Sequence, residues 1–386
     1  MAQATAKYPH KSSRELRASL VLFTLLSSPS IVRLGLMFWK FLQFIRFPVS
    51  PLVRFTGYYQ FCAGKDVVAS AAVTSRIRQH NVYSVLDYTH EHALNEQDFD
   101  YNLAVVLQTI SEAQRSKSYP FVVVKPTALG AFRLFEKKSN GGAFSSEEQH
   151  GWDKTRKRFE QLAKETEKAG IVLMIDAEES WIQPGIDALV LPLLPTFNQK
   201  RVVVAITFQL YLKNQIENYK KLIIDATSNN YFLGVKWVRG AYMEKERDRA
   251  ERLGIPNPVC DTKDQTDLQY RQAVELALKH IDTQLCIVAT HNESDILWVM
   301  DICATFKISI NNSNLWFSQL YGMRDYITFD LAAKGANVFK YVPFGPLSKS
   351  IPYLIRRALE NSAVKSQTAR EKVMIKAELK QRRASV

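Results

Sequence analysis

Two adjacent arginines near the C-terminus, Arg356 and Arg357, are placed to bind one small anion together. If this segment is helical, Tyr353 and Glu360 share a face with them, because such positions lie about one and two turns apart. Neighbouring guanidinium groups repel each other unless an anion neutralises them, and their planar forks suit bidentate binding of a carboxylate. A solvated basic helix face is the alternative interpretation. The preceding Tyr341 and a Pro-Phe-Gly-Pro turn favour the carboxylate clamp.

Short apolar or β-branched runs alternate with long charged stretches of helical period from about residue 83 onward. The runs are Ser84–Tyr88, Phe121–Lys125, Ile171–Ala177, Val202–Gln209, Gly234–Tyr242, Leu285–Thr290, Leu315–Leu320 and Val338–Val342. This alternation predicts parallel strands joined by crossover helices, either in a closed (β/α)8 barrel or in a doubly wound open sheet. None of the runs leads into a GxGxxG turn, and no GxxxxGK[ST] motif occurs, so the sequence favours the barrel.

Polar residues stand at the predicted strand ends, where the chemistry of such barrels collects. They are Asp87, Lys125, Asp176, Gln209, Arg239, His291, Gln319 and Lys340. Lys125 is a candidate for a Schiff base, for a partner of a substrate carboxylate or of Asp176, or for a side chain that extends into solvent. Asp176 at a barrel mouth needs a partner. Gly240 and Ala241 lack bulk, which would let a flat ring or a pyrophosphate approach the backbone.

The neighbouring acids Glu178 and Glu179 are not interpreted as metal ligands, because no His or Asp lies at ligand spacing near them. We expect them to be solvated or ion-paired. Four scattered cysteines form no CxxC pair, which argues against zinc or a disulfide framework and fits a reducing compartment. No metal site is predicted.

The composition allows one large core, with or without an accessory module, since 46% of the 386 residues are hydrophobic. The formal net charge of +13 predicts an anionic partner, which is nucleic acid, a membrane surface or an acidic ligand. The basic residues are diffuse and no nucleic-acid-binding motif is legible, so we expect no nucleic acid. We expect three parts, namely an N-terminal helical region over 1–82, a barrel over 83–361 and a basic helical tail over 362–386.

Both ends of the chain are candidates for contact with a membrane surface. The sequence pattern of the N-terminal part predicts helices over Leu16–Leu26, Ile31–Phe47 and Val67–Gln79. No charge-free apolar run is long enough to span a bilayer. An organellar presequence stays open as an alternative. We expect most apolar residues of this part to pack on the barrel, and the tail from Lys365 to Arg383 to be a candidate for peripheral membrane contact.

Several of these segments together resemble the proline dehydrogenase family, from about Ser84 to Asn361. The resemblance rests on Val238–Tyr242 with Glu244 and Glu246, on Ala289–Asn292, on Leu320–Met323, and on Tyr341–Pro346 leading to Tyr353–Arg357. It implies FAD-dependent oxidation of L-proline to Δ1-pyrroline-5-carboxylate, the first step of proline catabolism to glutamate, with electrons passed to a membrane quinone. It also implies a protein at the bacterial inner membrane, or in the mitochondrial matrix or inner membrane of a eukaryote.

The resemblance also implies roles for single residues. Arg356 and Arg357 would bind the proline carboxylate with the help of Lys125, while Tyr341 and Tyr353 pack against the ring. Asp176 would organise the site. The residues in contact with FAD would be Ala177, Gln209, Val238, Arg239, Gly240, Ala241, Thr290 and His291. Lys236 stands where many bacterial relatives carry an arginine near flavin N5, and it keeps the charge but lacks the fork.

Three other functions remain as alternatives. A hydroxyproline dehydrogenase would have a smaller polar residue in place of Tyr341. A Schiff-base aldolase on the same barrel would use Lys125 or Lys236 as its nucleophile. A basic nucleic-acid-binding protein is the alternative from a different class.

Overall fold

The strands of the fold belong to one sheet in the order β1-β8-β7-β6-β5-β4-β3-β2. The structure is a computed structural model that describes residues 7–44, 57–89, 93–363 and 365–384. The strands are β1 (Tyr83–Tyr88), β2 (Phe121–Val124), β3 (Val172–Ile175), β4 (Val204–Gln209), β5 (Leu233–Val238), β6 (Gln284–Ala289), β7 (Leu315–Leu320) and β8 (Val338–Phe344). Each overlaps one of the predicted runs. Parallel strands that alternate with helices in this order form a (β/α)8 barrel, as the sequence predicted.

The chain divides into two compact units, of which the first is Met1–Thr89 with Gln319–Val386 and the second is His90–Ser318. Helices of the first unit are α1 (Ser13–Leu26), α2 (Pro29–Phe44), α4 (Tyr59–Phe61), α5 (Val67–Arg78), α15 (Asp325–Ala333), α16 (Leu347–Ala363) and α17 (Lys365–Ala384). Those of the second are α6 (Glu96–Ser116), η2 (Pro126–Ala128), α7 (Phe132–Ser139), α8 (Ser146–Ala169), α9 (Gln183–Val190), α10 (Leu193–Phe197), α11 (Gln215–Ser228), α12 (Met243–Leu253), α13 (Lys263–Lys279) and α14 (Glu293–Thr305). The predicted boundaries at residues 82 and 361 stay predictions.

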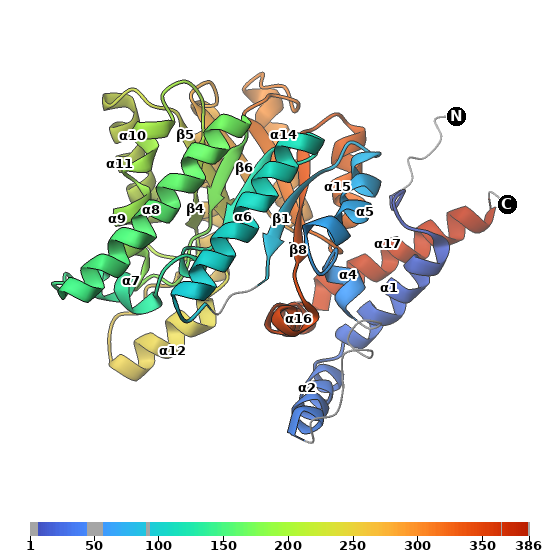
Figure 1. Ribbon diagram of the computed structural model, residues 1–386. Coiled ribbons are helices and arrows are strands. Elements are labelled where there is room, and N and C mark those ends of the chain that lie inside the picture. The colour runs from blue at the N-terminus through green and yellow to red at the C-terminus, as the bar shows by residue number, and fades with distance from the viewer. Residues whose placement is uncertain (1–6, 45–56, 90–92, 364, 385–386) are drawn as a thin grey trace. The chain divides into compact units, whose positions relative to one another are not determined.

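The second unit shows how local sequence sets the crossovers. Helix α8 begins at a capping box, in which Ser145 and Glu148 satisfy each other's backbone N–H groups, and it ends at Gly170 in a left-handed conformation. The chain then enters β3, which pairs in parallel with β2 and β4. Helices α6 and α8 lie side by side along β2 and β3 (Figure 1). Each crossover therefore returns the chain to the same end of the sheet, so that the carboxyl ends of β2 to β5 are neighbours.

The first unit carries the two ends of the chain. Helix α17 lies along α1 (Figure 1), and its apolar residues Met374, Ile375 and Leu379 are buried. The predicted helices α1, α2 and α5 are present, although residues 45–47 of the second prediction lie outside the described part of the chain. Within that part, no single helix is long and apolar enough to cross a bilayer, and α1 with part of α2 meets this measure only as a pair bent by 94°.

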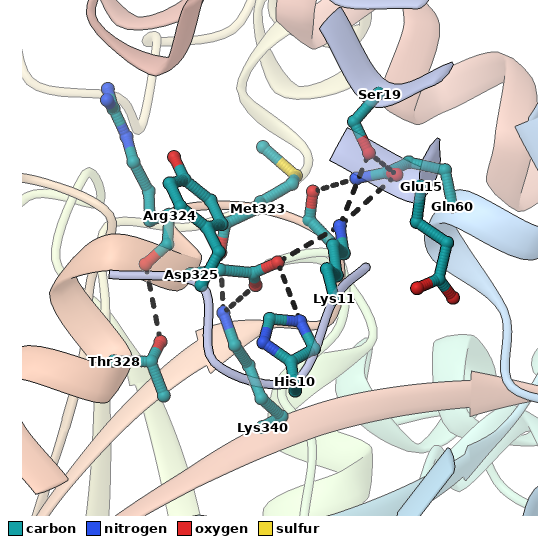
Figure 2. A network of polar contacts seen from close by, with 12 residues as sticks. His10, Lys11, Glu15, Ser19, Gln60, Met323, Arg324, Asp325, Thr328 and Lys340 are labelled. Carbon is teal, nitrogen blue, oxygen red and sulfur yellow. Dashed lines mark hydrogen bonds and ion pairs between the residues drawn. The ribbon is translucent and has the colours of Figure 1, made fainter. Parts of the chain in front are cut away.

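A cluster of buried charges joins the N-terminal segment to α15 and β8 (Figure 2). The Asp325 carboxylate lies 2.9 Å from Lys340, 3.2 Å from Lys11 and 3.3 Å from His10. Burial opposes the charge of Asp325, but the Lys340, Lys11 and His10 side chains hold the pKa of its carboxyl well below the usual range. Lys340, which the sequence placed among the strand-end polar residues of a site, is therefore committed to this structural cluster.

Candidate active site

Asp176, directly after β3, is the centre of a group of charges in the second unit. The Lys236 Nζ atom, from β5, donates a hydrogen bond to its Oδ1 atom, and the Lys125 Nζ atom, at the end of β2, lies 3.9 Å from its Oδ2 atom. The exposed fractions of these three side chains are 16%, 7% and 14% for Asp176, Lys236 and Lys125. One carboxylate is therefore shared by two ammonium groups. Of the interpretations of Lys125, the structure supports the pairing with Asp176.

Arg239, just after β5, is held by side chains from the following helices. Its guanidinium group donates to Asp267 of α13 at 2.9 Å, to Asp295 of α14 at 2.5 Å and to the Thr290 hydroxyl at 3.1 Å. Burial disfavours the charged form, yet Asp295 raises the pKa of Arg239 above its ordinary value. The side chain thus anchors its own turn, and sequence reasoning missed both acids because their helical spacing shows no link to Arg239.

Gly240, just after β5, lies against the ring of Tyr211. Its backbone φ is +131°, and a Cβ atom there would lie 1.7 Å from the ring of Tyr211. Glycine is therefore required at this turn, and the predicted approach of a flat ring or a pyrophosphate to its backbone stays a prediction. The next amide, that of Ala241, donates to the Gln209 Oε1 atom at 3.2 Å, and the Gln209 Nε2 atom donates to the Glu178 carbonyl at 2.6 Å.

The residues predicted to bind a cofactor all stand at or just beyond the ends of four consecutive strands. Ala177 follows β3, Gln209 ends β4, Val238, Arg239, Gly240 and Ala241 end or follow β5, and Thr290 and His291 follow β6. The Thr290 hydroxyl is oriented because it also accepts from the amide of Asn292 at 3.1 Å. These positions are as the strand pattern predicted, and the contacts with a cofactor stay predictions.

The acids after Asp176 differ from each other. Glu179 forms an ion pair with Lys245 at 2.7 Å, as expected. Glu178 is not solvated, because it is 4% exposed and its carboxylate accepts hydrogen bonds from Thr127. Burial raises the pKa of Glu178 to about 7, although the hydrogen bonds from Thr127 act in the opposite direction. Sequence reasoning missed Thr127, for which no motif gives a signal.

The arginine pair lies in the first unit, on α16. Tyr353 is 3% exposed, and the guanidinium carbons of Arg356 and Arg357 lie 6.0 and 5.3 Å from the centre of its ring. Arg357 is buried and pairs with Glu360 at 2.5 Å, so the predicted shared helix face is confirmed. Within the described part of the chain, the Tyr353 hydroxyl and the Arg357 Nε atom are buried and lack a hydrogen-bond partner. Tyr341 of β8 is also buried.

The start of α16 is fixed within its own unit. Gly345, just before the helix, has φ of +147°, and a Cβ atom there would lie 2.6 Å from the Thr89 hydroxyl. That hydroxyl is 2.8 Å from the Ser350 hydroxyl on the first turns of α16. Glycine is therefore required at this turn, and the helix that carries the arginines has a defined starting direction.

Comparisons with known proteins agree with this fold and these motifs. The family model described as proline dehydrogenase matches residues 71–370. The chain is 33% identical over 322 residues to the carbapenem antibiotics biosynthesis protein CarD of Pectobacterium carotovorum, covering 83% of each chain. It is 30% identical to the mitochondrial proline dehydrogenase 1 of Arabidopsis thaliana, covering 86% of this chain and 75% of that one.

Solved structures show the same fold. Proline utilization A from Bdellovibrio bacteriovorus superimposes with a TM-score of 0.72 at 20% identity, over 94% of this chain and 39% of the other. The chain thus spans about two-fifths of that protein. The architecture is a (β/α)8 barrel, and the family that the chain matches is one of oxidoreductases. The chain belongs to the proline dehydrogenase family.

Proposed function

We propose that this protein oxidises L-proline to Δ1-pyrroline-5-carboxylate with bound FAD, the first step of proline catabolism to glutamate. The observation that carries the proposal is the buried face of α16. Arg357, Arg356 and the Tyr353 hydroxyl offer donors for a carboxylate, and the Tyr353 ring offers an apolar surface for a small saturated ring. In this proposal Tyr341 also packs against the ring, and Lys125 assists the two arginines.

The residues at the ends of β3 to β6 fit an anionic dinucleotide such as FAD. The donor set supports this fit, since the Lys236 ammonium, the Gln209 amide and the Thr290 hydroxyl stand at the carboxyl ends of neighbouring strands. When bound, FAD supplies the hydride acceptor. The protein's own residues would bind the substrate, orient it and provide the positive charge around it.

The proposed mechanism assigns one task to each group. Arg356 and Arg357 bind the carboxylate, so that the ring carbon next to nitrogen is held in one orientation. The positive charge of Lys125 and of the arginines disfavours the protonated amine of proline, so the free amine that can be oxidised is favoured. Asp176 orients the ammonium of Lys236, which stabilises the negative charge that hydride transfer brings.

The function is tested by the visible absorbance of the purified protein. Anaerobic addition of L-proline is expected to bleach a flavin spectrum, because the flavin takes up the hydride. A protein without flavin that forms a reducible imine through Lys125 or Lys236 would instead be the aldolase. If L-proline leaves the flavin oxidised while another amino or hydroxy acid reduces it, the proposed substrate is wrong.

Substrate choice is expected to depend on Tyr341. Replacing Tyr341 with serine should lower turnover of L-proline and improve trans-4-hydroxy-L-proline relative to it, since a smaller polar side chain in place of the buried phenol would admit a ring hydroxyl. The ratio of kcat/KM for the two substrates measures the change. A wild-type enzyme that already prefers hydroxyproline would show that the alternative family function is the correct one.

We further propose a membrane quinone as electron acceptor and peripheral contact with an anionic bilayer, at the mitochondrial inner membrane or its bacterial counterpart. The support is the surface of α1 and α2, not that of the tail. Side chains of Val21, Leu25, Ile31, Leu34, Met37 and Phe38 are exposed. The exposed charged residues among the described side chains of these helices are Arg14, Arg17 and Arg33. Each such cation contributes about 1 kcal/mol near an anionic leaflet.

Of the two ends that the sequence offered for membrane contact, this surface favours the N-terminal one. Most apolar residues of the N-terminal part were expected to pack, and the structure buries Leu16, Phe23, Leu26 and Val32 but exposes six others. The tail was the other candidate, but α17 packs against α1 with Met374, Ile375 and Leu379 buried. A pattern of basic and apolar residues has the same appearance whether its apolar face meets a bilayer or another helix.

The double replacement Leu34→Glu and Phe38→Glu is expected to abolish pelleting with vesicles that contain an anionic phospholipid. Both side chains are more than half exposed, so the fold should tolerate the change. Val373→Glu, at an equally exposed position on α17, is the matched control and should pellet like the wild type. The exposed surface of α1 and α2 does not bind lipid if the double variant still pellets. The same conclusion follows if light scattering shows that the wild type is a dimer and the double variant a monomer.

A further inference from the structure

Glu178 is a buried acid to which the proposed chemistry assigns no task. It lies two residues after Asp176, and its side chain is enclosed although a carboxylate is costly to bury. Its Oε1 atom accepts from the Thr127 amide at 2.8 Å, and its Oε2 atom accepts from the Thr127 hydroxyl at 2.8 Å. Both oxygens are thus used on a single residue of a neighbouring strand end.

Thr127 belongs to the short turn that carries Lys125. This turn leaves β2 at Lys125 and forms the 3-10 helix η2, whose first residues have few backbone hydrogen bonds of their own. The Lys125 ammonium lies 3.9 Å from Asp176, at the outer limit of an ion pair. A pair at that distance does not fix its own geometry. The carbonyls of Ala128 and Leu129 at the end of the turn accept from Asn102 and Arg158, and the carboxylate of Glu178 holds the turn at Thr127, next but one to Lys125.

The main chain of Glu178 continues the connection. Its carbonyl accepts from the Gln209 amide at 2.6 Å, and Gln209 accepts from the Ala241 amide at 3.2 Å. Its amide donates to Gln183 at 2.9 Å. Hydrogen bonds therefore link the ends of β2, β3, β4 and β5 through one residue, and only the link to β2 depends on the Glu178 side chain.

We infer that Glu178 is a positioning residue, whose carboxylate holds the Lys125 turn at the place where Lys125 assists substrate binding. This rests on the proposed role of Lys125. Because only the link to β2 passes through the side chain, Glu178 acts on the affinity for proline and leaves the β4–β5 side of the site in place. A purely structural role would lower stability without this selectivity.

The test compares Glu178→Ala with Glu178→Gln and with Tyr219→Phe. Tyr219→Phe removes another buried hydrogen bond of the same unit, the one to Gln284 at the start of β6, which is the opposite end of the strands. Glu178→Ala is expected to raise KM for L-proline about fivefold to tenfold with kcat within about twofold, which corresponds to the loss of about one net hydrogen bond. Glu178→Gln, which retains one acceptor oxygen, should recover part of the affinity, and Tyr219→Phe should leave KM unchanged.

A double variant with Lys125 distinguishes a positioning role of Glu178 from a general loss of stability. If Glu178 acts through Lys125, the double variant Lys125→Met/Glu178→Ala has the same KM as Lys125→Met alone. Additive effects, an unchanged KM in folded Glu178→Ala, or an equal rise in Tyr219→Phe would overturn the inference.

Hydrogen exchange gives a readout that needs no substrate. The Thr127 amide is expected to exchange faster in Glu178→Ala than in the wild type or in Tyr219→Phe. An unchanged exchange rate rejects the constraint on the turn. A wild-type enzyme that is inert toward L-proline, with faster exchange in the variant, would reject the proposed function and leave the constraint established.

Discussion

Replacing Arg357 with methionine is expected to raise KM for L-proline about ten- to a hundredfold, because each charge-assisted hydrogen bond to the carboxylate contributes about 1.5–3 kcal/mol. Methionine keeps an apolar stem like that of arginine but is shorter and has no donor. Arg356→Met should have an effect of the same kind, and the maximum rate should fall less than the affinity. Steady-state kinetics over a wide range of proline concentration measures both parameters.

The control for this prediction addresses Glu360. Removing Arg357 leaves the Glu360 carboxylate without its ion pair, and burial already raises its pKa although Arg357 acts against that shift. Arg357→Met could therefore destabilise the fold for a reason unrelated to substrate. Adding Glu360→Gln should restore the thermal midpoint and leave KM high. An apparent affinity for proline that stays unchanged in both single arginine variants would reject the carboxylate clamp.

Lys236→Met is expected to lower the rate of flavin reduction by proline about a hundredfold or more, the size of effect seen when one preorganised electrostatic group is removed. Lys236 is almost fully buried and its ammonium donates to Asp176. The variant loses the positive charge and also removes one of the two ammonium groups that pair with the Asp176 carboxylate, the other being that of Lys125 at 3.9 Å. Anaerobic stopped-flow absorbance measures the reduction rate at saturating proline.

Lys236→Arg is the matched replacement. The guanidinium keeps the charge and can pair with Asp176 through two donors, so this variant should retain reduction within about tenfold of the wild type. Equal rates in Lys236→Met and in the wild type would show that the ammonium takes no part in the reaction. A low rate in Lys236→Arg together with a folded protein would show that geometry matters more than charge at this position.

The barrel could be predicted from sequence because each buried parallel strand has a recognisable local sequence pattern. Each strand is a short β-branched or apolar run between charged helices, and its end is marked by a polar residue. Lys125 could be named as a possible partner of Asp176 on that basis, since β2 and β3 are neighbouring parallel strands that end at the same side of the sheet. The face shared by Tyr353, Arg356 and Arg357 followed in the same way from helical spacing.

The partners of these residues could not be predicted, because they come from distant segments with no periodic relation to the site. Lys340 was expected among the polar residues of a strand-end site, yet its ammonium group forms an ion pair with the buried Asp325. The contacts of Glu178 with Thr127 and of Arg239 with Asp295 join residues 51 and 56 positions apart. Strand patterns define which face a residue occupies, but side-chain hydrogen bonds depend on loop paths that the pattern does not encode.

The pairing of α1 with α17 places the two extremes of the chain in one buried polar network, in which the Tyr8 hydroxyl donates to Glu371 across 363 residues. A chain made from its N-terminus must therefore leave this partner surface of α1 uncovered until the last helix has been synthesised. At about 5–20 residues per second, that interval is roughly tens of seconds. During it, the side of α1 that α17 covers is open to chaperones and to aggregation.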